Sequence, residues 1–478
     1  MRIQAFKKPL LSIAALFVGM LAYGQQSDSL MHYIEIATKN NPTVLQRLYE
    51  YQSALQKVPQ VGSLPDPELN IGVFLKPMDI MSGKQIANIT LMQMFPWYGV
   101  LSNAKDEMSL MAKAKYESFY DAKLQVAYDV KRSWYNLLRV QQTIRISTKN
   151  LEILRTIERL SLAKFKAATA GSISAPSGSS KTISSTSTSS SNAGGMQGMG
   201  GLSGSATVAQ PSMAMQGGAI GMSSTGYGLA DLYRIQIEIG DLENDIALLN
   251  DQMKTSIARF NSYLNRPLTH GVTLPDTLKA ESFNIQMETT SDSMFANNPM
   301  LNMLKYEQQS LEARKRMVSR MGNPMVGLGL SYSIISKSSM SSSSMNGNDM
   351  LMPMVSVTLP IFRKKYRAMQ TETELMKAAT EQSYTSTSNS LQAEYYEAVQ
   401  LFKDARRRTM LYADQSMLAK KSLDILIKSF TASGANLSDI LRIRQQLLSY
   451  EQKQVDAITD YNTAIAWLNR LTATPQSR

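Results

Sequence analysis

Cysteine is absent from this 478-residue chain, histidine occurs only twice, and charged residues make up only 18% of it. The absence of cysteine excludes disulfide frameworks, thiolate zinc sites, a cysteine nucleophile and a lipid-modified amino-terminal cysteine. Two histidines give little basis for an imidazole-based metal centre or a Ser-His-Asp triad. No nucleophile–base pair or metal-ligand cluster stands out, so the sequence predicts neither an enzyme nor a bound cofactor.

Long apolar runs are also missing after the amino terminus, where no stretch approaches the length of a membrane-spanning helix. A mature chain of this kind can enter a membrane only as a β-barrel, or lie on its surface. Basic residues outnumber acidic ones by 50 to 38, but they are scattered and the chain starts with an export signal. We therefore expect no nucleic-acid partner.

The amino terminus has the parts of a secretory signal peptide. Arg2, Lys7 and Lys8 form a basic start, and residues 10–22 form an apolar core of 13 residues. Small residues lie at the positions needed for cleavage after Gly24. The alternative, a retained anchor, is disfavoured because the core is too short to span a bilayer.

The rest of the chain is a tandem duplication. Asn40-Asn41-Pro42 recurs as Asn297-Asn298-Pro299, and Pro67 recurs as Pro324 at the same offset. Three further pairs follow in the same order: Phe95-Pro96 with Leu359-Pro360, Leu229–Leu232 with Leu437–Ile440, and Leu264-Asn265-Arg266 with Leu468-Asn469-Arg470. Such ordered matches indicate two copies of one structural unit.

Each half predicts a short helix, two strands, a very long helix, a tip and a shorter helix. Residues 100–170 and 361–433 contain neither glycine nor proline, which predicts continuous helices of roughly 100 Å. Helices of that length exceed a globular core and need coiled-coil partners. The predicted short helices are 43–58 and 300–320, and the predicted partners of the long helices are 229–266 and 435–471.

The strand-like runs alternate between apolar and small polar residues. In 325–334, for example, Val326, Leu328 and Leu330 alternate with glycine and serine. The other alternating runs are 69–75, 87–91 and 355–359. This pattern favours strands between lipid and a wet lumen, with a half-buried soluble sandwich as the alternative. Four strands cannot close a barrel, so several chains would have to pool their strands.

Four features occur in a fixed order: the duplicated NNP starts, the strand pairs that end at Phe95–Gly99 and Leu359–Phe362, the GANLSDIL segment 434–441 and the LNR endings. Together they resemble the TolC-type outer-membrane efflux channel family. The resemblance covers nearly all of the mature chain except residues 166–228. It implies a mainly α fold with membrane β-structure, in which a homotrimer builds a twelve-stranded barrel in outer-membrane lipid and a helical tunnel through the periplasm. It also implies a Gram-negative cell, a periplasmic adaptor and an inner-membrane pump of the resistance-nodulation-division or a related type.

The boundaries expected on this basis follow the two halves. Before and within repeat 1 they are 1–24 for the signal peptide, 25–66 for the first periplasmic helices, 67–96 for the first β-hairpin, and 97–266 for the first long helical hairpin with a disordered insertion at 166–228. In repeat 2 they are 267–323 for a linker and the first helices, 324–360 for the second β-hairpin with a Met-rich loop, and 361–478 for the second long helical hairpin.

Asp231 and Asp439 match the acidic positions that narrow the closed end of the family's channel. By this resemblance, a carboxylate from each of three chains would form a ring that favours cations. Each aspartate could instead cap the start of a helix, and both roles can coexist. Arg234 and Arg442 stand where some members have a second acid, so a double acidic ring is in doubt and the arginines are secondary tip residues.

Methionine is abundant, with 31 residues, and it collects in two polar segments. The Ser/Gly-rich insertion contains Met196, Met199, Met213, Met215 and Met222. The second cluster, expected in the second strand-pair loop, is Met340, Met345, Met350, Met352 and Met354, and Met78 and Met81 are expected in the first such loop. Thioether sulfur prefers Cu(I) or Ag(I), which predicts transport of these ions as substrates. The alternative is that methionine serves as adaptable apolar filler.

Three functions remain open at this point. The first is an outer-membrane efflux duct, with Cu(I) or Ag(I) as the favoured substrate. The second is an outer-membrane duct for drugs, other organic compounds or exported proteins. The third, from a different class, is a secreted coiled-coil interaction protein, which would not need the alternating strands or the duplication.

Overall fold

The computed structural model of the chain describes residues 30–80, 82–171, 229–283, 294–340, 344–432 and 436–473. Two compact units are present, one formed by Lys149–Asn244 and the other by the remainder of the chain. The predicted signal peptide lies outside the described residues. So do the predicted insertion beyond Gly171 and the methionines at 196, 199, 213, 215 and 222.

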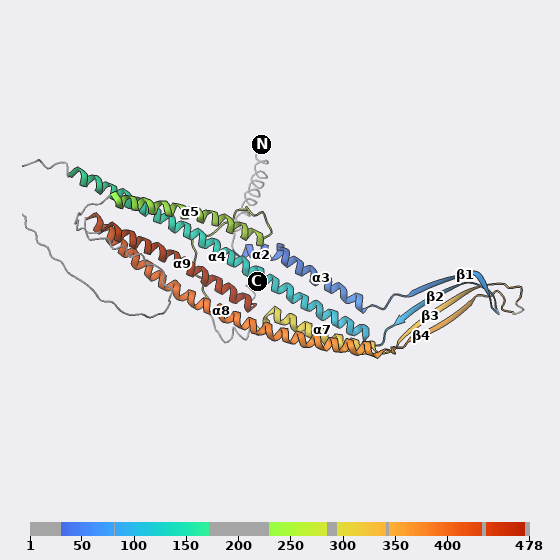
Figure 1. Cartoon of the computed structure of the whole chain (residues 1–478). Helices are drawn as coiled ribbons and strands as arrows, with labels where there is room; N and C mark the ends of the chain where they lie inside the picture. Colours follow the sequence, from blue (N-terminus) through green and yellow to red (C-terminus); the bar gives the residue numbers. More distant parts are fainter. Residues whose placement is uncertain are drawn as a thin grey trace, which may run out of the picture. The chain divides into compact units, whose positions relative to one another are not determined.

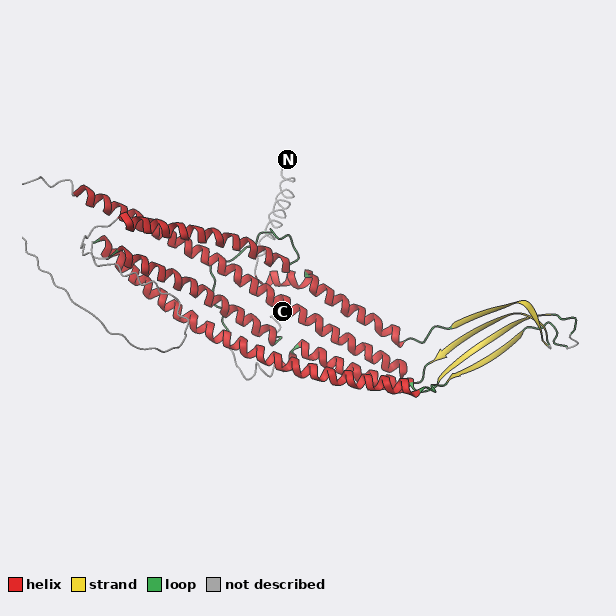
Figure 2. Cartoon of the chain, viewed as in Figure 1, coloured by secondary structure: helices red, strands yellow, loops and turns green. Residues whose placement is uncertain are grey.

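Helices dominate the chain (Figures 1 and 2). In chain order they are α2 (Leu30–Asn40), α3 (Pro42–Gly62), α4 (Val100–Gly171), α5 (Leu229–Tyr263), α7 (Pro299–Met321), α8 (Arg363–Thr431) and α9 (Leu437–Leu471). The strands are β1 (Glu68–Ile80), β2 (Gly83–Phe95), β3 (Met325–Ser336) and β4 (Met350–Thr358). None of the helices within the described ranges is long and apolar enough to cross a membrane.

The two unbroken helices expected from the absence of glycine and proline are confirmed as α4, with 72 residues, and α8, with 69 residues. The predicted insertion at 166–228 begins too early, because α4 continues to Gly171. Helix α3 is also longer than predicted, since it runs through Pro59 to Gly62. Because proline has no backbone N–H, Pro59 cannot donate to the carbonyl of Leu55 in the last turns of this helix.

The repeated NNP motif has the same structural task in both halves. Asn41 is the N-cap of α3, where its Oδ1 accepts a hydrogen bond from the Thr43 backbone N–H at 2.9 Å. Its Nδ2 donates to the carbonyl of Tyr263 at 2.9 Å, which ties α3 to the end of α5. In the second half, Asn298 caps α7 and donates to the carbonyl of Leu471 at 3.3 Å, at the end of α9. One buried asparagine per half therefore starts one helix and holds the end of another.

Each half also has its own hydrophobic core within the larger unit. In the first half Tyr33, Trp134 and Phe260 form an aromatic cluster with ring centroids 5.2–5.8 Å apart. In the second half Phe402 and Tyr461 stack at 4.9 Å in the core between α8 and α9. The duplication thus gives two separately closed cores.

The LNR endings, by contrast, differ between the halves. Helix α5 ends at Tyr263, before the predicted residue 266, and Asn265 follows with a left-handed φ of 53°. Helix α9 includes Leu468-Asn469-Arg470 and continues to Leu471. The same three residues follow the end of a helix in the first half and lie inside the last turn of a helix in the second half. Both arrangements are possible because asparagine tolerates both backbone conformations.

The smaller unit, Lys149–Asn244, pairs the last part of α4 with the first part of α5. Leu154 and Ile157 of α4 and Ile235 of α5 are buried, as the helical spacing predicts. Arg155 donates to Glu243 at 2.8 Å across this pair. The unit is an antiparallel coiled-coil segment, which agrees with the packing that a helix of this length requires.

The four strands form one antiparallel sheet in the order β1-β2-β3-β4 (Figure 1). β2 belongs to the first half and β3 to the second, and they pair from Lys84↔Ser336 to Phe95↔Val326. Gly83 begins β2 with a φ of 125°, and a Cβ there would lie 2.4 Å from the Ser336 carbonyl oxygen. Glycine is therefore required where the first hairpin turns back against β3.

Candidate functional site

The sheet has one continuous apolar face. Strand register places side chains from all four strands in common rows, since paired residues point to the same side. One row holds Leu69, Leu91, Leu330 and Pro353, and the next holds Ile71, Ile89, Tyr332 and Leu351. These side chains are not covered by the described part of the chain: Ile71 is 64% exposed and Leu330 is 46% exposed. An apolar face of this extent needs lipid or another protein against it.

The opposite face is polar, and its side chains are linked to one another by hydrogen bonds. The Thr90 hydroxyl donates to Ser331 Oγ at 3.3 Å, and the Ser331 hydroxyl donates to Asn88 Oδ1 at 2.8 Å. Gln85 donates to Ser333 Oγ at 3.1 Å. These contacts link β2 and β3, so the wet face predicted from the alternation is built from both halves of the chain.

Both edges of the sheet lack a partner within the described part of the chain. β1 pairs only with β2, β4 pairs only with β3, and nearly every residue of β1 is exposed. Backbone N–H and C=O groups on such edges need hydrogen-bond partners, above all in lipid. The sheet is therefore incomplete as a single copy.

The methionine cluster expected in the second strand-pair loop is placed differently. Met340 and Met345 do lie between β3 and β4, where they are 89% and 59% exposed. Met350, Met352 and Met354 instead lie inside β4, paired with Ser333, Ser331 and Gly329. Met78 likewise lies in β1, and Met81 is outside the described residues. The predicted loop between β3 and β4 was too long, because a Ser- and Met-rich sequence resembles a loop and does not show where β4 begins.

Register also brings in two methionines that the sequence analysis missed. Met92 and Met94 of β2 lie on the polar face, beside Gly329 and Gly327 of β3. Met350, Met352 and Met354 share that face across β3. The signal available in the sequence was the spacing of two in both strands, since alternate residues of a strand point to one side.

The two tip aspartates occupy equivalent positions in their halves. Asp231 lies in the first turn of α5 and Asp439 in the first turn of α9. Asp439 is not the cap of its helix, because Asn436 holds that position. Arg442 instead donates to the Asp439 carboxylate at 3.1 Å, and their side chains are 69% and 47% exposed. The carboxylate thus faces solvent with a cation beside it.

A charged hollow of about 990 Å³ lies between the two halves, among α4, α5, α8 and α9. Arg408 reaches from α8 to Asp460 of α9 at 3.0 Å, and Arg139 reaches from α4 to Asp456 at 3.4 Å. Burial raises the pKa of Asp129, which also lines the hollow, while a hydrogen bond from a nearby glutamine opposes that shift. The ion pair of Arg139 with Asp456 therefore joins the two halves here, whereas that of Arg408 with Asp460 lies within the second half.

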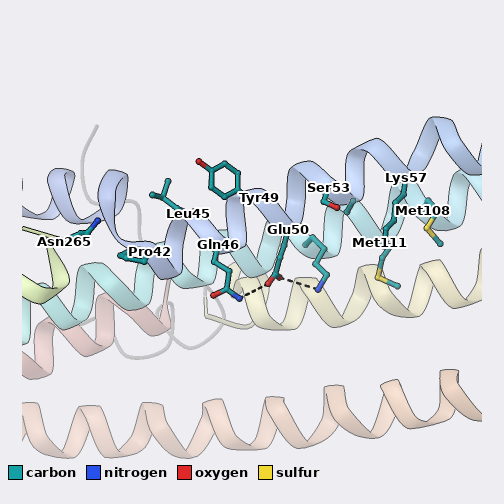
Figure 3. A pocket seen from close by; sticks show the side chains of 12 residues that line it. Pro42, Leu45, Gln46, Tyr49, Glu50, Ser53, Lys57, Met108, Met111 and Asn265 are labelled. Atoms are coloured by element: carbon teal, nitrogen blue, oxygen red, sulfur yellow. Dashed lines mark hydrogen bonds and ion pairs between the residues drawn. The ribbon is translucent and has the colours of Figure 1, made fainter.

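A second groove, of about 1020 Å³, follows the outer side of α3 against α4 (Figure 3). Leu45 and Tyr49 of α3 and Met108 and Met111 of α4 line it, and Tyr49 is 62% exposed. Glu50 is held at its floor by Gln46 at 3.1 Å and by a lysine of α4 at 3.7 Å. The groove is an apolar helical surface that the described chain leaves uncovered.

Groups of histidine, aspartate and glutamate that could hold a metal ion are absent from the described residues, and the chain has no cysteine. Thioether and hydroxyl groups, by contrast, lie together on the polar face of the sheet.

Comparison with known proteins identifies the fold. No family model and no curated protein matches the sequence. Among solved structures, the outer membrane protein VceC of Vibrio cholerae is 11% identical, with 93% of this chain and 95% of that chain covered and a TM-score of 0.66. CusC, studied for its transmembrane channel formation, is 12% identical over 93% of this chain and 91% of its own, with a TM-score of 0.68.

The MtrE outer membrane channel of Neisseria gonorrhoeae, in its open state, is 13% identical, with 93% and 89% of the two chains covered and a TM-score of 0.66. The chain therefore has the fold of the TolC-type outer-membrane channels, and the predicted fold class is confirmed. At these identities the likeness concerns the fold, so function has to be argued from the sheet and the helices.

Proposed function

We propose that the protein is the outer-membrane exit duct of an efflux system, assembled as a homotrimer. The observation that carries this proposal is the sheet, with one apolar face, one polar face and two unpaired edges. Joining β4 of one copy to β1 of the next would satisfy every edge and place the apolar faces toward lipid. Three copies would supply twelve strands, enough for a barrel with an open lumen.

The helices support the same assembly. α4 and α8 are long enough to extend far into the periplasm from the membrane, at about 1.5 Å per residue. The groove beside α3 is a surface that a neighbouring copy would cover. By resemblance to the family, the distal ends would meet a periplasmic adaptor and an inner-membrane pump, which supplies the energy. The duct itself catalyses no reaction.

Asp231 and Asp439 are proposed as ring-forming residues at the periplasmic end. Their equal positions in the two halves support the proposal, because each would recur by threefold symmetry in the trimer. Arg442 beside Asp439 would weaken the negative field of that ring, so the ring should favour cations only modestly. Asp439→Asn should therefore reduce cation selectivity, measured as reversal potential in a salt gradient, whereas Arg442→Gln should increase it.

The transported substrate proposed here is Cu(I) or Ag(I). Thioethers suit these soft ions and resist the oxidising conditions outside the cytoplasm better than thiolates do. The exposed Met340 and Met345 between β3 and β4, and the five methionines of the polar segment 166–228, support a soft-metal substrate. Efflux of organic compounds, or protein export, is the second candidate, favoured by the breadth of substrates that one duct fold can serve.

The duct is tested by purification from the membrane fraction. We expect a trimer in detergent that conducts ions in a planar bilayer. Recovery from the soluble periplasm, or a monomer in detergent, would contradict the proposal. The substrate is tested separately by deleting the gene: sensitivity to copper and silver is expected, whereas unchanged metal tolerance with altered drug tolerance would support the second candidate.

A further inference from the structure

The polar face of the sheet carries a band of sulfur atoms that crosses from one strand to another. Along β4, Met350, Met352 and Met354 follow each other at every second residue. The row of Met354 contains Gly329 and Met92, and the following row contains Ser356, Gly327 and Met94. Glycine in β3 is the middle residue of both rows, between Met92 and Met354 in the first and between Met94 and Ser356 in the second. The band therefore passes from β4 to β2 over a strand that has no side chain there.

Gly327 lets three side chains pack closely together in this band. An ideal Cβ at Gly327 would lie 2.6 Å from Met94 Sδ, 3.2 Å from Met92 Sδ and 2.3 Å from Ser356 Oγ. Two thioether sulfurs and one hydroxyl oxygen thus gather over the bare Cα of Gly327, so closely that a side chain there would push them apart. The Ser356 hydroxyl also lies 3.2 Å from Met92 Sδ and 3.7 Å from Met94 Sδ, which holds the three groups together.

The neighbouring glycine leaves room for Met92 in the same way. A Cβ at Gly329 would approach Met92 Cε to 3.4 Å and the Leu91 carbonyl oxygen to 3.0 Å. Glu68 pairs with Met92 in the β1–β2 register, so its side chain lies on the same face. A cation held by the two thioethers and the hydroxyl would therefore have a carboxylate in the same row as Met92.

The chemistry of these ligands selects the ion. Thioether sulfur is a soft, uncharged ligand that favours Cu(I) and similar monovalent soft ions over hard cations such as Mg²⁺ or Ca²⁺. Imidazole and thiolate, which would also retain Zn²⁺ or Cu(II), are not among these three groups. Neutral ligands also bind more weakly than thiolates, which suits an ion that must leave again.

We propose that Met92, Met94 and Ser356 form a transient binding site for a soft monovalent metal ion around Gly327, and that Met354, Met352 and Met350 continue the path along β4. As a step in transport this rests on the duct proposed above, with the polar face lining the lumen. As a binding site it can be tested on its own.

The test is silver binding to the full-length protein in detergent. Silver nitrate is titrated calorimetrically in a chloride-free nitrate buffer, because silver needs no reductant and chloride would precipitate it. The five methionines of residues 196–222 are first changed to leucine, so that they do not contribute to the measured silver binding. Met92→Leu/Met94→Leu is then compared with Met108→Leu/Met111→Leu, a matched pair of substitutions on α4.

We expect the β2 pair to weaken silver binding by more than about tenfold, the loss that even outer-shell changes cause at metal sites, while the α4 pair leaves it unchanged. X-ray absorption at the silver edge should show Ag–S contacts that decrease in the β2 pair. Gly327→Ala should also weaken binding although both thioethers remain. Unchanged affinity in the β2 pair, or in Gly327→Ala, would overturn the site.

Channel conductance of the same samples separates this result from the duct. A Met92→Leu/Met94→Leu trimer that conducts like the parent but has lost silver binding would support both proposals. A variant trimer that conducts and still binds silver like the parent would contradict the proposed binding site but not the proposed duct. A parent protein that neither trimerises nor conducts would contradict the duct, whatever its silver affinity.

Discussion

The helices of the larger unit and the four-stranded sheet bury their apolar side chains in different ways. The helices close a core within each half, where Phe260 and Leu301 are fully buried. The sheet has no such core on its apolar face, where Ile71 is 64% exposed and Val355 is 70% exposed. The cores of the helices are therefore closed within one chain, whereas the apolar face of the sheet needs lipid or another protein against it. The two regions should respond differently to mutation, and this comparison can be tested.

The largest effect is expected in the helical core of the first half. Phe260→Ala removes a ring that is fully buried and packs edge-on against Tyr33 at 5.2 Å. Loss of such a side chain costs about 3–5 kcal/mol of folding free energy. Thermal unfolding followed by circular dichroism in detergent should show a strongly lowered melting temperature. Tyr233→Ala, which removes an exposed ring near the start of α5, is the matched control.

A charge on the sheet should act through the membrane rather than through a core. Ile71→Arg places a cation on the apolar face of β1, at a cost of about 2–4 kcal/mol near the middle of a bilayer. Asn70→Arg places the same cation on the polar face, one residue away, and should be tolerated. Folding into lipid vesicles, followed by heat-modifiable mobility on gels, measures both. Equal effects of the two substitutions would contradict the assignment of the faces.

A smaller effect is expected at the asparagine caps. Asn298→Ala removes the cap of α7 and the bond to the end of α9, and should lower stability by about 1 kcal/mol. Asn41→Ala should do the same in the first half, since the geometry is repeated. Asn40→Ala, at an exposed neighbouring side chain, serves as the control. Chemical denaturation of each variant would show whether the two halves depend equally on their caps.

The smallest effect should depend on pH. Burial raises the pKa of Glu107 in α4, and Arg314 partly opposes this shift. Because the folded pKa lies above the unfolded one, the charged carboxylate destabilises the fold at neutral pH, and this cost disappears below the unfolded pKa. Glu107→Gln should therefore raise the melting temperature by about 2 °C at pH 7 and leave it unchanged at pH 3.5. The same increase at both pH values would refute this account.

Much of the fold could be predicted from local patterns. The absence of glycine and proline located α4 and α8, and period-two alternation located the four strands, because both patterns follow from backbone geometry within one element. The repeated NNP motif located the starts of α3 and α7, although only the structure showed the second task of each asparagine. The length of β4 was underestimated because its Ser- and Met-rich sequence resembles a loop.

The candidate sites were less predictable. The positions of Asp231 and Asp439 follow from the resemblance, but the contact between Arg442 and Asp439 depends on the helix turn that places them together. The soft-ligand character of the chain was visible from its methionines and its lack of cysteine. Met92 and Met94 were overlooked because they are separated from Met354 by more than 250 residues.

The order of residues alone determined the two long helices and the alternation of each strand, since these depend on neighbours a few positions apart. The duplication was also visible there, because matching segments recur in the same order. The tertiary structure decided which strand pairs with which, and hence that Gly327 of one half lies between two methionines of the other half and a serine of its own. That arrangement depends on strand register, which is set by hydrogen bonds between distant segments and changes the facing side chains completely with a shift of one residue.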